Sequence, residues 1–309
     1  MNNKSIKRLS FLGIVLGIFL ISSFISYNEN GNAIWTKIFS TVNLSSFSEK
    51  EKDYNMGVHF LSVGKADCSY IKFGNANILI DSGDKEIFPT TIKYLNRRGI
   101  RKLDLVIATH PHRDHIGQMS DIIDRFEIGC FIMSKVPDKV PKDSETYDKM
   151  MVSLKRKNVN IRYAKPGERI KILDLTVDIL GPCRTYEKLN DNSVVAKLTY
   201  GEDSFLFMGD AEKNSEKDLI ESKKDLKAEV LKVGHHGSKT STTVKFIEKV
   251  RPKYAVISSG PNKFGLPSRK TIDNLNKFMV NVLRTDVMGD ISFFTNGNGL
   301  EFISQKSVA

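Results

Sequence analysis

The segment at residues 109–115, Thr-His-Pro-His-Arg-Asp-His, constrains the fold and chemistry of this chain more than any other. It follows an apolar run at residues 103–108, which predicts a buried strand. Pro111 and the short spacing favour a loop in which two side chains can face one metal ion and two another. Imidazole and carboxylate are ligands for zinc, manganese or iron. The four candidate ligands are His110, His112, Asp114 and His115.

The distribution of histidine supports metal binding. The chain has six histidines; three lie in this segment, and His235 and His236 are adjacent within Val-Gly-His-His-Gly-Ser at residues 233–238. This pair also follows an apolar run, at residues 228–233. Five of the six histidines therefore stand at the ends of two predicted strands, which favours a metal site over a polar loop with histidines by chance.

The N-terminal residues differ from the rest of the chain. Basic residues at positions 4, 7 and 8 precede an uncharged run at residues 9–28 that is rich in Leu, Ile, Phe and Gly. A helix of this length spans about 30 Å, the hydrocarbon thickness of a bilayer. Because the basic residues come first, the positive-inside rule places the N-terminus in the cytoplasm and the remainder outside. A cleaved signal peptide, and hence a secreted protein, is the alternative, but no clear small-x-small cleavage site follows.

This pattern predicts four parts and a basic domain. Residues 1–8 form a cytoplasmic tail, 9–28 a single-pass anchor, 29–56 a linker and 57–309 one globular domain. The formal net charge is +11; residues 1–56 hold six Lys or Arg and four Asp or Glu, which leaves +9 on the domain. That charge suits nucleic acid, a phosphate-rich wall polymer or lipid headgroups, with a solvated lysine-rich surface as the plain alternative. Three widely spaced cysteines indicate no disulfide framework.

Strand and helix patterns alternate from residue 57 onward in two similar halves. Strands are predicted at residues 58–63, 68–73, 76–80, 103–109, 128–133, 159–164, 170–180, 193–200, 204–208, 228–233, 254–259, 282–285 and 290–295. Helices are predicted at residues 87–98, 116–126, 144–157, 242–250 and 269–279, with another opening after residue 212. This alternation predicts an α/β (α+β) fold in which two mixed sheets pack together with helices outside.

These motifs resemble the metallo-β-lactamase superfamily and, within it, the soluble domain of the ComEC competence-protein family. The resemblance covers about residues 57–304. It rests on the two histidine motifs and on residues 58–67, 79–83, 191–193, 207–212 and 284–286. It implies a four-layer αββα sandwich with a one- or two-metal site at one edge. The implied activity is metal-assisted hydrolysis, often of phosphodiesters.

The resemblance also implies a role for each candidate ligand. One of the adjacent histidines completes the second metal site. Because neighbouring residues in an extended segment point in opposite directions, we expect one to bind metal and the other to face the substrate. We assign His236 as the ligand and His235 as a phosphate contact or proton donor, and the reverse assignment stays open. The other implied ligands are His110 and His112 at the first site, Asp114 and His115 at the second, and Asp210 as a bridge.

The expected cofactor is one or two zinc ions, with manganese as the alternative. Two metal ions lower the pKa of a shared water and clamp the oxygens of a phosphate. Asp114 is expected to orient or deprotonate that water while bound to metal. Asp81, which follows the predicted strand at residues 76–80, is expected to support a metal ligand from behind.

Three residues are assigned to substrate binding, and some of the sequence departs from the family pattern. Lys65 stands where the family often has Gln, and Asn192 where many members have the third histidine of the first metal site. That site is therefore short of protein ligands. Ser238 precedes a predicted helix whose N–H groups could hold a phosphate, or else it caps that helix. Ser62 and Leu266 replace an Asp and a His of the family pattern.

We therefore expect a membrane-anchored, extracytoplasmic metallohydrolase that acts on a phosphate ester or phosphodiester. Nucleic acid is the first candidate substrate, and a teichoic-acid or phosphocholine-type wall polymer is the second. A true β-lactamase is not favoured, because nothing beyond the shared histidine segment resembles that branch. The alternative is a nucleic-acid- or wall-polymer-binding protein that keeps the fold without turnover, which the departures at Ser62, Lys65 and Leu266 motivate. The sequence leaves the oligomeric state open.

Overall fold

The computed structural model describes residues 51, 53–85, 90–135, 137 and 144–306. The chain divides into two compact units, Met1–Asp53 and Tyr54–Ala309. The predicted tail at residues 1–8, the anchor at 9–28 and the linker up to residue 50 lie outside the described residues. Within the described part of the chain, no helix combines the length and the apolar character needed to cross a bilayer.

Two β-sheets form the centre of the second unit. One has the order β17-β16-β1-β2-β3-β5-β7-β8 and the other β15-β14-β13-β12-β11-β10-β9, while β4 (Lys102–Leu103) and β6 (Glu127–Ile128) pair separately. The first sheet comprises β1 (Met56–Phe60), β2 (Ser69–Phe73), β3 (Ala76–Ile80), β5 (Leu105–Ala108), β7 (Phe131–Met133), β8 (Ile161–Tyr163), β16 (Ile291–Thr295) and β17 (Glu301–Ser304). The second comprises β9 (Arg169–Ile172), β10 (Leu175–Gly181), β11 (Val195–Tyr200), β12 (Asp203–Phe207), β13 (Val230–Lys232), β14 (Tyr254–Ile257) and β15 (Asn281–Arg284).

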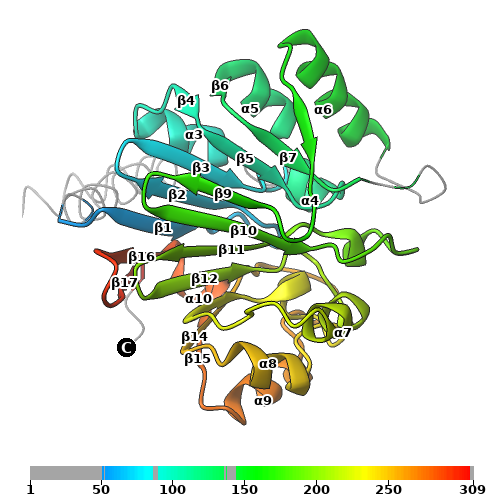
Figure 1. The fold of residues 1–309 in the computed structure, drawn as a ribbon, viewed down its shortest axis with the longest axis vertical. Helices are drawn as coiled ribbons and strands as arrows, with labels where there is room; N and C mark the ends of the chain where they lie inside the picture. The colour runs from blue at the N-terminus through cyan, green and yellow to red at the C-terminus, as the bar shows by residue number, and fades with distance from the viewer. Residues whose placement is uncertain (1–50, 52, 86–89, 136, 138–143, 307–309) are drawn as a thin grey trace, which may run out of the picture. The chain divides into compact units, whose positions relative to one another are not determined.

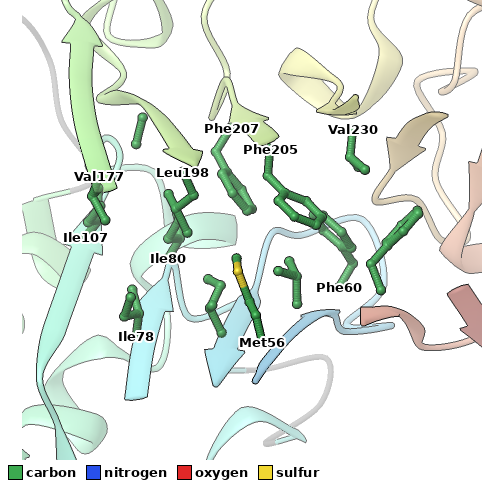
Figure 2. Packing of buried hydrophobic residues seen from close by; sticks show 14 of the residues in the cluster. Met56, Phe60, Ile78, Ile80, Ile107, Val177, Leu198, Phe205, Phe207 and Val230 are labelled. Carbon is green, nitrogen blue, oxygen red and sulfur yellow. The ribbon is translucent and has the colours of Figure 1, made fainter. Parts of the chain in front are cut away.

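The main hydrophobic core lies between the two sheets. Along β12, Phe205 and Phe207 face this core while Leu206 faces the outer side, which is the two-residue period of a strand. Phe60 of the first sheet stacks on Phe207 of the second, with ring centroids 5.8 Å apart. Figure 2 shows these rings together with Ile107 and part of the same apolar cluster. This packing holds the two sheets face to face.

Helices cover both outer faces, as Figure 1 shows, and each outer face has its own apolar cluster. The first sheet carries α3 (Thr90–Arg97), α4 (Arg113–Ile116), α5 (Met119–Arg125) and α6 (Ser144–Arg156). The second carries α7 (Lys213–Glu221), α8 (Val244–Val250) and α9 (Arg269–Asn276), and α10 (Thr285–Met288) follows β15. The predicted sandwich of two mixed sheets between helices is confirmed for the described residues.

Several predicted elements differ in detail. The strand predicted at residues 170–180 is a hairpin of β9 and β10. Leu173 occupies the left-handed position of its turn (φ 52°), where Gly or Asn is usual. The helix predicted at residues 116–126 begins earlier, as α4, and is broken before α5. Strand β17 and helix α10 were not predicted, since short elements at an edge carry little periodic signal.

Candidate metal centre

The candidate ligands gather at one edge of the sandwich because several strands run in the same direction. β3, β5 and β7 are parallel to one another, and so are β12, β13 and β14. The carboxyl ends of parallel strands lie at one edge, where loops can converge. The ligands come from the loop after β5 (His110, His112), from α4 (Asp114, His115), from the turn after β12 (Asp210) and from the 3₁₀ turn Gly234–Gly237 after β13 (His235, His236).

The first ligand group consists of His110, His112 and Asp210. One donor atom from each of these residues lies within 4.8 Å of the others. Nε2 of His110 is 2.9 Å from Nδ1 of His112 and 3.7 Å from Oδ2 of Asp210. The second ligand group consists of Asp114, His115 and His236, and it meets the same distance criterion.

Asp210 stands between the two ligand groups. Its Oδ1 is 3.1 Å from Nε2 of His115 and 3.7 Å from Nε2 of His236, while Oδ2 faces the first group. Nε2 of His236 is also 3.4 Å from Oδ2 of Asp114. Gly209 precedes Asp210 with a positive φ of 53°, and a Cβ there would lie 2.9 Å from the Cβ of Thr109. Glycine thus lets the Asp210 turn approach the histidine loop.

Three buried atoms at this point have no hydrogen-bond partner among the described residues: Nε2 of His115, Nε2 of His236 and Oδ1 of Asp210. A buried polar atom without a partner costs about 1–3 kcal/mol. The three atoms point toward one another, and nitrogen and carboxylate oxygen are the donors that zinc and manganese accept. The residues present therefore fit a divalent metal ion.

Asp81 supports His115 from behind, in the arrangement typical of metal-binding histidines. Its Oδ2 is 2.8 Å from Nδ1 of His115, so that Nε2 is the nitrogen left for a metal. Thr109 donates its backbone N–H to Oδ1 and its hydroxyl to Oδ2 of the same carboxylate, each at 2.8 Å. Asp81 adopts a left-handed conformation (φ 59°), which places its side chain between the two segments.

The electrostatics of the cluster suit a cation. Burial alone would raise the pKa of Asp210, but the imidazoles of His115, His236 and His110 hold it well below its ordinary value. Burial would likewise lower the pKa of His115, yet the carboxylates of Asp210 and Asp81 hold it well above its ordinary value. Burial and the charge of His115 lower the pKa of His110. The carboxylates thus demand a positive charge that a divalent ion would supply.

The double histidine is not extended, contrary to the argument from strand geometry. His235 (φ 50°, ψ 47°) and His236 (φ 51°, ψ 28°) are both left-handed, which costs about 1–2 kcal/mol for each non-glycine residue. The turn still separates the side chains. His236 is fully buried in the second ligand group, whereas the side chain of His235 is 25% exposed. The physical reason is the left-handed turn between two glycines, and not strand alternation.

His235 is oriented by Glu212, a residue that we did not assign from the sequence. Oε1 of Glu212 is 3.1 Å from Nδ1 of His235 and accepts a hydrogen bond from the hydroxyl of Thr240 at 2.8 Å. Burial would raise the pKa of Glu212, but its hydrogen bonds to His235, Thr240 and Lys188 lower it to about 2. Nε2 of His235 faces Oδ2 of Asp210 at 3.8 Å. One ring nitrogen is thus held by a carboxylate while the other faces the cluster.

Lys65 and Asp114 form an ion pair at the edge of the cluster. The ammonium group binds Oδ2 of Asp114, the same oxygen that faces His236. Burial would raise the pKa of Asp114, but the neighbouring imidazoles of His236 and His115 lower it. The side chains of Lys65, Asp114 and His235 are 21%, 19% and 25% exposed, so this side of the cluster is the one open to solvent.

The structure does not bring Asn192 to the cluster as a free amide. Its Oδ1 accepts the N–H of Tyr186 at 3.0 Å, and its Nδ2 donates to the carbonyls of Tyr186 and Lys188 at 2.8 and 2.7 Å. The side chain is fully buried and closes the segment at residues 186–192. The Asn192 amide that we assigned to substrate binding is therefore hydrogen-bonded within the protein.

Ser238 lies beside His235 and not at the start of a helix. Its hydroxyl is 2.9 Å from that of Thr240, and its N–H donates to the carbonyl of His235. Helix α8 begins at Val244 and is capped by Thr243, whose side chain accepts from the N–H of Phe246. The phosphate site expected from a helix N-terminus at Ser238 is therefore not formed.

A buried ion pair behind His236 was also not predicted. Nζ of Lys232 donates to Oδ2 of Asp67 at 2.9 Å, and the two side chains are 3% and 5% exposed. Oδ1 of Asp67 is 3.5 Å from Nδ1 of His236. Asp67 comes from the loop between β1 and β2, and Lys232 from the end of β13. The two residues are 165 positions apart, so no local pattern could pair them.

The motif at residues 191–193 positions the Asp210 turn. Oδ1 of Asp191 accepts the backbone N–H groups of Glu212 and Ser215 at 3.1 and 3.2 Å. The hydroxyl of Ser193 accepts the N–H of Asp210 at 3.0 Å. This motif therefore acts on the backbone of the ligand-bearing turn. Its position directly before a strand, with small polar side chains, was the available sequence signal.

Comparisons with known proteins agree with this geometry. The family model described as "Metallo-beta-lactamase superfamily" matches residues 61–260. The chain is 34% identical over 213 residues to ComE operon protein 3 of Bacillus subtilis (strain 168), an overlap of 68% of this chain and 26% of that protein. It is 27% identical over 240 residues to Competence protein ComA of Neisseria gonorrhoeae, an overlap of 75% and 31%. The chain thus spans about a quarter to a third of these curated relatives.

A solved structure shares the architecture. The metallo-beta-lactamase fold protein YhfI from Bacillus subtilis matches with a TM-score of 0.52 and 13% identity, over 80% of this chain and 99% of that chain. At this identity the likeness concerns the fold alone.

Proposed function

Because this chain belongs to the metallo-beta-lactamase superfamily, we propose that it is a metal-dependent hydrolase of phosphodiesters, with nucleic acid as its first candidate substrate. The predicted resemblance to competence proteins is confirmed by two of the matches above. The proposal is carried by the convergence, at His115, His236 and Asp210, of buried atoms that have no hydrogen-bond partner among the described residues. Such a cluster lowers stability unless a cation fills it.

The proposed metal ligands are the two groups described above. A divalent ion bound there would act as a Lewis acid on water and on a phosphoryl oxygen. Asp210 bridges the groups because each of its oxygens faces one of them. The ligands are His110, His112 and Asp210 in the first group, and Asp114, His115, His236 and Asp210 in the second.

The part-exposed residues perform the proton transfers and hold the substrate. Asp114 orients the attacking water and takes its proton. The N–H of His235 donates its proton to the leaving oxygen as the P–O bond breaks, and Glu212 stabilises the imidazolium before that step. Lys65 holds a non-bridging phosphate oxygen, since its ammonium lies on the open side of the cluster.

The substrate assignment is supported by charge and by relatives. Residues 57–309 carry a formal charge of +9, which attracts a polyanion. One matched relative is named Competence protein ComA, which favours nucleic acid over a wall polymer such as teichoic acid.

We further propose that residues 9–28 anchor the protein in the membrane with residues 57–309 outside the cell. The basic residues before this run support that orientation. Full-length protein should stay in membranes after carbonate washing, and protease added to spheroplasts should digest residues 57–309. A shortened protein recovered from the medium would favour a cleaved signal peptide.

The proposed activity is tested with full-length protein in detergent. Metal is removed with a chelator and restored as zinc or manganese, and turnover of the p-nitrophenyl ester of thymidine 5′-phosphate is followed. Turnover should vanish with the metal and return with it. A protein that binds metal but hydrolyses neither this ester nor DNA would contradict the proposal.

A second candidate, a binding protein without turnover, is favoured by one contact. The ammonium of Lys65 occupies Oδ2 of Asp114, where it competes with a metal ion. Lys65→Met distinguishes the two. If Lys65 holds substrate, the variant loses turnover; if it only blocks the metal, the variant binds metal more tightly and gains activity.

A further inference from the structure

An exposed aromatic ring stands at the open side of the metal centre. Phe264 is 64% exposed and lies in the loop at residues 260–267, which follows β14. Nζ of Lys65 lies 5.5 Å from the centre of this ring, and Nζ of Lys263 lies 5.8 Å from it. Lys65 also binds Asp114. A single lysine side chain therefore links a candidate metal ligand to an exposed aromatic face.

The loop at residues 260–267 presents Phe264 rigidly. Asn262 donates to the carbonyls of Gly260 and Leu266 at 2.8 Å each. Its Oδ1 accepts the N–H groups of Phe264 and Leu266 at 3.0 Å each. One amide side chain thus fixes the loop across its width. The ring is exposed because the loop holds it there, and not because the loop lacks structure.

The same loop is packed between two segments of the metal centre. A Cβ on Gly260 would lie 2.6 Å from the Cα of Gly64, so the loop backbone touches the turn that carries Lys65. On the other side, a Cβ on Gly237 would lie 2.7 Å from the Cβ of Pro267. Gly237 closes the turn that holds His235 and His236. The position of Phe264 is therefore tied to the ligand-bearing turns.

We propose that Phe264 is a stacking platform for an unpaired nucleobase of the substrate, with Lys65 and Lys263 holding adjacent phosphates. This inference rests on the proposed function and narrows its substrate to single-stranded nucleic acid. An aromatic ring beside cationic groups is the arrangement by which proteins bind single strands, because every base offers a flat π face. In a duplex those faces are covered by neighbouring base pairs. A polymer of glycerol phosphate or ribitol phosphate offers charge but no planar face.

The test is a binding measurement on full-length protein in detergent with chelator present, so that no strand is cut. Fluorescence anisotropy compares a short oligothymidine with an abasic strand of equal length. Phe264→Ala should weaken oligothymidine binding about 5- to 100-fold, and Phe264→Tyr should stay within about threefold of wild type. Both variants should bind the abasic strand as wild type does.

A matched control removes a different exposed aromatic ring. Phe278 is 38% exposed and precedes β15, at the amino ends of the parallel strands and away from the metal centre. Phe278→Ala should leave both affinities unchanged. A strand containing 2-aminopurine adds a direct signature, because stacking on Phe264 quenches its fluorescence and Phe264→Ala should restore it.

Two outcomes for Phe264→Ala would overturn the platform. One is an equal loss of affinity for abasic and thymidine strands in Phe264→Ala; the other is no loss for either. Tighter binding of a glycerol phosphate polymer than of oligothymidine by the wild type would also overturn it.

Kinetic measurements after metal is restored then distinguish this inference from the proposed function. If Phe264→Ala raises KM for single-stranded DNA with little change in kcat, the ring contributes binding alone. If the wild type binds thymidine strands through Phe264 but cuts no phosphodiester, the proposed function fails and the platform stands. If the wild type cuts phosphodiesters and Phe264→Ala binds thymidine strands normally, the platform fails and the function stands.

Discussion

The two groups of candidate metal ligands differ in how the rest of the protein holds them. In the second group, His115 is hydrogen-bonded to Asp81, and His236 lies beside the buried ion pair of Asp67 and Lys232. Both imidazoles are fully buried. In the first group, the second ring nitrogen of His110, Nδ1, faces the hydroxyl of Thr109 at 3.2 Å and, among the described residues, no carboxylate. The ligand side chains of the second group are therefore held in place by more contacts than those of the first.

This difference implies unequal metal affinity. A carboxylate behind a histidine fixes its tautomer and raises its basicity, which strengthens metal binding. The first group has two imidazoles and a shared carboxylate, one protein ligand fewer than the second. We expect one metal ion to bind tightly at the second group and another loosely at the first, with activity rising on addition of manganese. Calorimetry showing two equally tight zinc ions would contradict this comparison.

The largest effect is expected from the residue that both groups share. Asp210→Ala should reduce phosphodiester turnover about 1,000-fold or more and weaken both metal ions, because several kcal/mol of charge stabilisation depend on the bridge. Asp178→Ala, on β10 and paired with Arg169, is the matched control and should retain turnover. Circular dichroism should show both variants folded. Wild-type turnover in Asp210→Ala would show that Asp210 is not the ligand shared by the two groups.

The second prediction asks whether the first group can be completed from the position where related proteins place a histidine. Asn192→His should lower the free energy of unfolding by about 3 kcal/mol, since three buried hydrogen bonds are lost at about 1 kcal/mol each. It should not add a zinc ion. Denaturation in urea and metal analysis measure the two results. An increase to two tightly bound zinc ions would show that the segment at residues 186–192 can turn toward the cluster.

The third prediction concerns only the second group. Asp81→Asn removes the charge behind His115 and should weaken the tight metal ion about 10- to 100-fold. The loose ion should change little, because Asp81 contacts neither His110 nor His112 in the described structure. Competition with a chromogenic chelator resolves the two affinities. Equal weakening of both ions would mean that the two groups are not held independently.

The smallest effect is expected from Glu216, which belongs to neither group of metal ligands. Burial raises the pKa of Glu216 to about 7, although its carboxylate accepts the N–H groups of Thr242 and Thr243. A carboxyl whose folded pKa lies above its unfolded value stabilises the fold when protonated. That contribution is fully present below about pH 4.5 and is lost as the pH rises through about 7.

The expected loss between pH 5 and pH 7 is on the order of 1–2 kcal/mol. Urea denaturation of metal-free protein should show this slope in the wild type and in Glu221→Gln, an exposed residue of the same helix. Glu216→Gln should flatten it. An unchanged slope in Glu216→Gln would assign the pH dependence to the metal ligands instead.

The sequence was informative wherever the residues of a functional motif lie together in one short segment. The segment at residues 109–115 contains four ligands and follows a strand, so its function is readable without the fold. Continuous apolar runs at residues 105–108 of β5 and 205–207 of β12 predict strands with two buried faces, and these are what the two sheets contain. The turn at Leu173 was missed because its left-handed position carries a leucine and not the glycine or asparagine that usually marks such a turn.

Residues that act across the fold could not be predicted in this way. Asp67 and Lys232 are ordinary polar residues until the two sheets bring them together as a buried pair. Asn192 occupies the expected position in the sequence, yet its amide is bound to the backbone of residues 186–188.

The sequence by itself determined the ligand types, the strands that carry them and the family of the chain. The tertiary structure decided which histidine of the adjacent pair is buried, which carboxylates besides Asp81 stand behind the ligands, and which aromatic ring is left at the open side. The physical reason is the distance along the chain over which each property is set. Side-chain chemistry and strand periodicity are set within a few residues, whereas burial and pairing depend on segments that meet only when both sheets have packed.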